Sequence, residues 1–135
     1  MRVSTHECEA MRIMEQLSTV GRILYAIPML MFGIFHFMKA DMMASMVPIP
    51  PEKLWVYLTG VALVAAAGAI IAKKQIFLAS LLLGVMLMIF VFSIHLPAAL
   101  GDGDGAQMAM MSMLKDVGLA GGAFYIAAMN RTGGS

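Results

Sequence analysis

Three long apolar stretches constrain the fold of this chain more than any other feature. Residues Val20–Met38, Leu54–Ala72 and Gln75–Leu96 are each close to 20 residues long and almost free of charge. A helix of about 20 residues spans the hydrocarbon core of a bilayer at a rise of about 1.5 Å per residue. A soluble domain carries about 25% charged residues, whereas this chain has 13%. These stretches predict membrane-spanning helices.

A fourth span is expected from about Met110 to Met129, which includes Lys115, Asp116 and the sequence GLAGGAFYIAA. No stretch favours a strand, so the predicted fold class is all-α, a transmembrane four-helix bundle with up-down-up-down topology. The domain division is a leader at 1–19, a four-span membrane domain at 20–130 and a flexible tail at 131–135. Met11, Ile13, Met14 and Leu17 have helical spacing in the leader, which predicts a short amphipathic helix at the membrane interface.

Basic residues predict the orientation in the membrane. With four spans, both termini share one side. Of the nine Lys and Arg residues, six lie on the side of the termini and three on the other. The six are Arg2, Arg12, Arg22, Lys73, Lys74 and Arg131, and the three are Lys39, Lys53 and Lys115. The positive-inside rule then places both termini in the cytoplasm. A net charge of +1 gives no basis for nucleic acid as a partner.

Polar residues return at the outer ends of the first, third and fourth spans. They are His36, Lys39, His95, Lys115 and Asp116. Ionisable residues in spans are costly and often functional, although at helix ends long side chains also reach the interface for structural reasons. We take His36, His95 and Asp116 as candidate catalytic residues.

The sharpest expectation concerns contact between a histidine and Asp116. Gly33, His36 and Ala40 share one helix face, and Asp116 begins a stripe of small residues in the last span. The first and fourth helices of a closed bundle are neighbours, and small residues let them approach. We predict direct or one-water contact between His36 and Asp116, or the same contact with His95 replacing His36.

Several short motifs resemble the DoxX-like family of small four-helix membrane proteins. The motifs are Gly21-Arg22, Phe32-Gly33-Ile34-Phe35-His36-Phe37 followed by Lys39, the VPIPP loop leading to Trp55-Val56-Tyr57-Leu58-Thr59-Gly60, and Leu114-Lys115-Asp116-Val117-Gly118-Leu119-Ala120-Gly121-Gly122. The resemblance covers about residues 20–130. It implies a four-helix bundle in the bacterial inner membrane. It also implies a link to quinone-dependent oxidation, since one branch is named for a thiosulfate:quinone oxidoreductase subunit.

The functional expectation is an accessory subunit of a quinone-linked redox complex, with Lys39, Lys115 and Trp55 as candidate headgroup-binding residues. Histidine titrates near neutral pH and suits proton exchange. The cofactor itself stays open, and so does the question of whether the protein is an enzyme. Its expected partners are the lipid bilayer and a membrane protein or further copies of itself.

Two alternatives stay open. The first is a non-enzymatic assembly or scaffold subunit that packs through small-residue faces. The second is a haem site between His36 and His95, or a copper site among outer methionines. These methionines are Met38, Met42, Met43, Met46, Met108, Met110, Met111 and Met113. No metal ligand set is assigned from the sequence.

Overall fold

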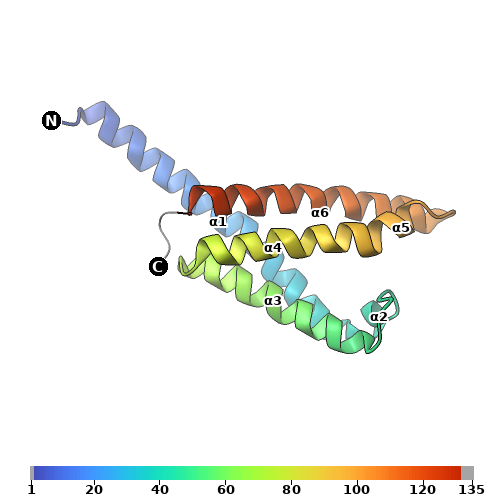
Figure 1. Ribbon diagram of the computed structural model, residues 1–135. Coiled ribbons are helices and arrows are strands. Elements are labelled where there is room, and N and C mark those ends of the chain that lie inside the picture. The colour runs from blue at the N-terminus through green and yellow to red at the C-terminus, as the bar shows by residue number, and fades with distance from the viewer. Residues whose placement is uncertain (1, 132–135) are drawn as a thin grey trace.

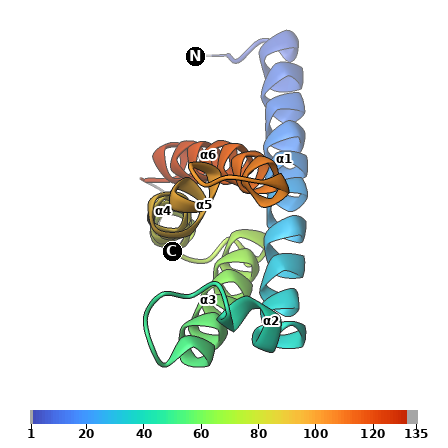
Figure 2. The same ribbon diagram turned by 90° about the vertical axis from the view of Figure 1, so that its right-hand side faces the viewer.

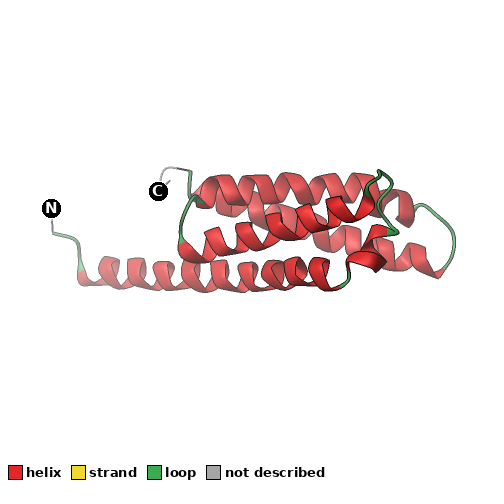
Figure 3. Cartoon of the chain, turned by 90° about the horizontal axis from the view of Figure 1, so that it is seen from below, coloured by secondary structure: helices red, strands yellow, loops and turns green. Residues whose placement is uncertain are grey.

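The computed structural model describes residues 2–131, and every regular element in them is helical (Figure 3). The elements are α1 (Thr5–Met38), α2 (Ala40–Ala44), α3 (Glu52–Ala72), α4 (Ile76–Phe90), the π-helix η1 (Val91–His95), α5 (Leu96–Ala99) and α6 (Asp104–Met129). The predicted all-α class is confirmed. Residues 132–135 of the predicted flexible tail lie outside the described residues.

Within residues 2–131, three helices are long and apolar enough to cross a membrane. They are Thr5–Met38, Glu52–Ala72 and the continuous helix Ile76–Ala99. Each contains one of the first three predicted spans, so the chain has the character of a membrane protein. The predicted fourth span falls in α6, which is not one of the three.

Helix α1 joins the predicted leader and the first span into one helix of 34 residues. Its start is fixed by a capping box, in which the Ser4 side chain accepts from the Glu7 N–H and Glu7 accepts from the Ser4 N–H. The expected boundary between leader and span lies near Val20. The helix continues there because a single glycine, Gly21, costs a helix only about 1 kcal/mol. The first buried residue is Arg22, so the leader extends away from the other helices (Figure 1).

The four long helices associate as two pairs that cross. Helix α1 packs along α3, and α4 packs along α6. The two pairs are inclined to one another, and their outer ends, at α2 and at α5, diverge (Figures 1 and 2). A shared core joins the pairs, built from Ala26, Met29, Leu63, Ala66, Ala67, Ile70, Leu83, Leu87, Ala120 and Ala123. This packing does not establish the closed up-down bundle predicted from the sequence.

The crossing of α1 and α3 depends on two glycines. A Cβ atom at Gly33 would lie 2.7 Å from Val64 Cγ2 and 3.1 Å from the Gly60 carbonyl oxygen. A Cβ at Gly60 would lie 3.0 Å from the Cβ of His36. The Gly33–His36–Ala40 face therefore packs against α3. The predicted packing of this face against the last helix is wrong, because a stripe of small residues does not specify which helix it meets.

Helix α1 touches α6 mainly through long side chains. The Tyr25 hydroxyl donates a hydrogen bond of 2.6 Å to the Leu119 carbonyl oxygen. A Cβ at Gly122 would lie 3.0 Å from the Tyr25 ring, so this glycine leaves room for the tyrosine. These contacts hold α1 across α6 before the two helices separate toward their outer ends (Figure 2).

The third helix continues past Leu96, where the third predicted span ends, and runs to Ala99. The chain passes through the π turn η1, where the Leu96 N–H bonds to the Val91 carbonyl, and continues as α5 to Ala99. A π turn changes the hydrogen-bond spacing just before the proline and lets the helix go on. Helix α6 starts at Asp104 after Gly103, whose φ of +101° suits glycine.

Candidate functional site

Asp116 is the centre of a polar cluster midway along α6, and not at its outer end as predicted, because the helix already begins at Asp104. Its Oδ2 atom lies 2.9 Å from Nε2 of His95, and its Oδ1 atom lies 3.5 Å from Nζ of Lys115. The Lys115 Nζ atom also lies 4.5 Å from the centre of the Phe32 ring, in cation–π geometry. We call Phe32, His95, Lys115 and Asp116 the Asp116 cluster. It draws on α1, η1 and α6.

Helical periodicity buries the carboxylate. Asp116 lies on the same face of α6 as Ala120, Ala123 and Ala127, and all four are buried. Lys115, one position earlier, points about 100° away around the helix and stays exposed. The adjacent acidic and basic residues thus have different surroundings, although their side chains still meet.

The π turn brings the histidine to this carboxylate. His95 is the last residue of η1, and one residue more per turn shifts everything after it around the helix axis. The π turn costs little at this place because Pro97, which follows it, has no N–H group to donate to the helix. The π turn and Pro97 together place the His95 ring beside α6.

The burial of Asp116 requires its two partners. Its side chain is only 8% exposed, whereas those of His95 and Lys115 are 25% and 49% exposed. An unpaired buried carboxylate costs several kcal/mol, and a donor at 2.9 Å with a cation at 3.5 Å offsets that cost. The partly exposed faces of His95 and Lys115 are the ones a ligand can reach.

The contact predicted for Asp116 is confirmed in its second form, with His95 in place of His36. The His36 Nδ1 atom lies 2.7 Å from the Phe32 carbonyl oxygen of its own helix. Its Cβ packs toward Gly60 of α3. His36 is excluded from the cluster because α1 has turned away from α6 by this point.

The other candidate residues lie outside the cluster. Lys39 is exposed where α1 ends, and its backbone N–H donates to the Phe35 carbonyl. Trp55 is 43% exposed near the start of α3. Within residues 2–131, no side-chain hydrogen bond or ion pair links either residue to Asp116. Among the candidate headgroup-binding residues, Lys115 is the one that contacts the cluster.

Phe32 is the member of the cluster that the sequence analysis did not single out. It lies one turn before His36, on the part of α1 that still faces α6. A phenylalanine in a span looks like lipid-facing packing when only the sequence is known. Its role depends on the crossing of two helices far apart in the chain.

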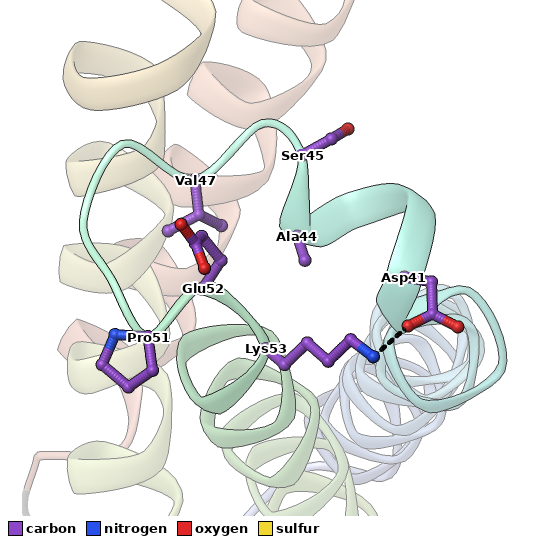
Figure 4. Close-up of a pocket in the computed structure, with 7 residues that line it drawn as sticks. All are labelled: Asp41, Ala44, Ser45, Val47, Pro51, Glu52 and Lys53. Atoms are coloured by element: carbon purple, nitrogen blue, oxygen red, sulfur yellow. Dashed lines mark ion pairs between the residues drawn. The ribbon is translucent and has the colours of Figure 1, made fainter.

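Two hollows lie elsewhere on the molecule. One of about 510 Å³ opens beside α2 and the start of α3 (Figure 4), and is lined by Asp41, Ala44, Ser45, Val47, Pro51, Glu52 and Lys53. Lys53 and Asp41 form an ion pair in it, but their side chains are 62% and 86% exposed. Such exposed pairs contribute little. We regard this hollow as a surface feature of the loop.

The second hollow, of about 410 Å³, is an apolar groove between α3 and α4. It is lined by Ala62, Ala65, Ala66, Ala69, Gln75, Leu78, Ala79, Leu82, Leu83 and Met86. Neither hollow includes His95 or Asp116. A ligand of the Asp116 cluster would therefore approach along the helix surface.

The haem and copper alternatives receive no support from the arrangement of possible ligands in residues 2–131. In the part of the chain that the structure describes, no group of three or more His, Cys, Asp and Glu side chains is arranged to hold a metal ion. The outer methionines are split between the segment around α2 and the start of α6. A haem or copper site remains a prediction from residue types alone.

Comparison with models of protein families, with curated proteins and with solved structures gives no match for this chain.

Proposed function

We propose that the protein is a four-pass membrane protein of the bacterial inner membrane, an accessory subunit that binds a quinone-type headgroup at the Asp116 cluster. The observation that carries the proposal is the 2.9 Å contact between His95 Nε2 and the buried Asp116 carboxylate. A histidine held by a buried carboxylate is a common arrangement for exchanging protons. The likeness to DoxX-like proteins supports the choice of ligand.

Each residue of the cluster has a distinct task in this proposal. Asp116 orients the imidazole by accepting from Nε2–H, and in the imidazolium form Nδ1–H of His95 can donate to a carbonyl oxygen of the ligand. Lys115 supplies positive charge near the same place, and Phe32 limits where its ammonium group can lie. A quinone headgroup supplies carbonyl oxygens that take up protons when it is reduced. The residues bind it, orient it and move the proton.

Helix α6 supports the fourth pass. Its 26 residues extend about 39 Å, enough to cross the hydrocarbon core. Asp116 and Lys115 lie midway along α6, where the carboxylate is buried against His95 of η1 and the lysine is paired with it, so the two charges offset one another within the span. The distribution of basic residues, six against three, favours cytoplasmic termini.

The assembly alternative is favoured by an exposed glycine on α6. In the Gly118-x-x-x-Gly122 motif, Gly122 packs on Tyr25. A Cβ atom added at Gly118 would meet no neighbouring atom within 4 Å, so this side of α6 is open. Such a site allows another membrane helix to approach closely. In this case the protein would purify with a stoichiometric partner in mild detergent, and substitution of His95 would leave that complex intact.

Quinone binding can be measured directly. Purified protein in lipid nanodiscs is titrated with a short-chain ubiquinone analogue by calorimetry. Wild type should bind, and Asp116→Asn and His95→Gln should each weaken binding about tenfold, which is about 1.4 kcal/mol. Lys53→Gln, which alters only an exposed ion pair, should bind like wild type. Absence of binding by wild type, or equal affinity in all four proteins, would exclude a quinone site here.

A further inference from the structure

The leader part of α1 carries an apolar stripe that no other part of the described structure covers. From Ala10 to Met38, apolar residues recur at alternating intervals of three and four. They are Ala10, Ile13, Leu17, Val20, Leu24, Ile27, Met31, Ile34 and Met38, and all are exposed. Within the leader, Ile13, Leu17 and Val20 are 50%, 65% and 53% exposed.

The stripe lies on the side of α1 that faces away from the bundle. The buried residues of α1 are Arg22, Ala26, Met29 and Gly33. Leu24 lies two residues from both Arg22 and Ala26, which is about 200° around the helix. The stripe is therefore a second face, separate from the one that packs on α3.

The leader reaches beyond the bilayer. At 34 residues, α1 is about 51 Å long, against about 30 Å for a hydrocarbon core. The Arg22 side chain bonds to Ile70, near the end of α3, which places the leader past the end of its neighbour. Ile13 and Leu17 thus lie where water would otherwise surround them, and their burial is favourable.

We propose that the stripe is the contact surface for α1 of a second copy of this chain, in a parallel two-stranded coiled coil. Intervals of three and four define the a and d positions of such a seam. Two copies inserted with the same topology present their leaders in parallel and in register, so the same stripe meets itself. The polar residues Arg12 and Glu15 lie on the opposite face and are exposed.

A lipid surface fits this helix less well. Helices that lie on membranes carry lysine and arginine on their polar face, whereas the leader helix has Glu7, Glu9 and Glu15 against Arg12. Lying flat would also need a bend between leader and span, and α1 is continuous there. Confinement to the membrane raises the local concentration of copies, which helps a short seam to pair.

Disulfide trapping in native membranes tests the proposal. In a Cys8→Ser background, Ile13→Cys or Leu17→Cys should give a covalent dimer on mild oxidation, because a and d side chains meet their counterparts across the seam. Glu15→Cys lies between them in sequence but on the opposite face, so it should stay monomeric. All three positions are exposed, so the substitutions should leave the fold unchanged.

Three outcomes would overturn the dimer. One is no crosslink at any position, and another is equal crosslinking at Glu15→Cys, which would indicate random collision. The third concerns a spin label at position 17. If lipid-soluble relaxants reach the label and it shows no dipolar coupling to a second label, the leader lies on the membrane surface. The result is independent of quinone binding, which involves residues of η1 and α6 outside the leader.

Discussion

At the scale of single residues, Arg22 shows how burial changes the role of a charged side chain. The sequence suggests an arginine that reaches the interface, but it is buried and donates to the Ile70 carbonyl at 3.2 Å and to Thr19 Oγ1 at 3.3 Å. The N–H groups of Lys73 and Lys74 both bond to Ala69, so Ile70 depends on another donor. A cation also suits the negative end of α3.

Replacement of Arg22 by methionine should therefore destabilise the protein by about 2 kcal/mol, since a buried carbonyl loses a charged donor. Arg12→Met is the matched control, because Arg12 is exposed on the leader and should change stability by less than about 0.5 kcal/mol. The midpoint of unfolding in SDS, followed by circular dichroism, measures both. Equal losses in the two variants would contradict a capping role for Arg22.

At the scale of elements, backbone approach between α1 and α3 determines the geometry. Gly33 and Gly60 let the two helices touch through backbone atoms, and this contact turns the His36 face toward α3. The same crossing leaves Phe32 beside α6 to contact Lys115. The position of the Asp116 cluster thus depends on glycines that lie outside it.

Gly33→Ala should cost about 1–3 kcal/mol, because its Cβ would overlap Val64 and approach the Gly60 carbonyl. Gly68→Ala on α3 is the control: nothing lies within 4 Å of its Cβ, and alanine favours the helix by about 1 kcal/mol. Thermal unfolding of both variants in one detergent compares them. If Gly33→Ala were as stable as Gly68→Ala, the crossing would not require glycine.

At the scale of the whole molecule, two crossed pairs give the protein two different ends. One end holds the leader and the tight α3–α4 turn, and the other holds the separated outer ends at α2 and α5 (Figure 1). The free thiol, Cys8, is exposed near the first end. This separation makes the orientation measurable.

With cytoplasmic termini, Cys8 should be protected from a membrane-impermeant thiol reagent in intact cells and react fully after lysis. Its exposure in the structure ensures that protection reports the membrane and not burial. A cysteine introduced at exposed Met46, in the Cys8→Ser background, should show the reverse pattern. Labelling of Cys8 before lysis would reverse the proposed topology.

The sequence by itself determined the class of the protein and much of its spans. Apolar runs of about 20 residues are incompatible with water, so the all-α membrane class follows from composition and length. The predicted ends at Met38 and Ala72 agree with the structure because charged lysines follow both helices. Helical periodicity also placed Asp116 on the buried stripe of α6.

Only the tertiary structure decided which helices pair, and with that the composition of the site. Several faces carry small residues, and such faces are nearly equivalent until a specific fit selects among them. Gly33 fits Gly60, so His36 is held at α3, and the π turn before Pro97 brings His95 to Asp116 instead. The burial of Arg22 has the same origin, because its acceptor lies 48 positions away in the chain. Contacts of this kind depend on side-chain shape across distant segments, which local periodicity does not encode.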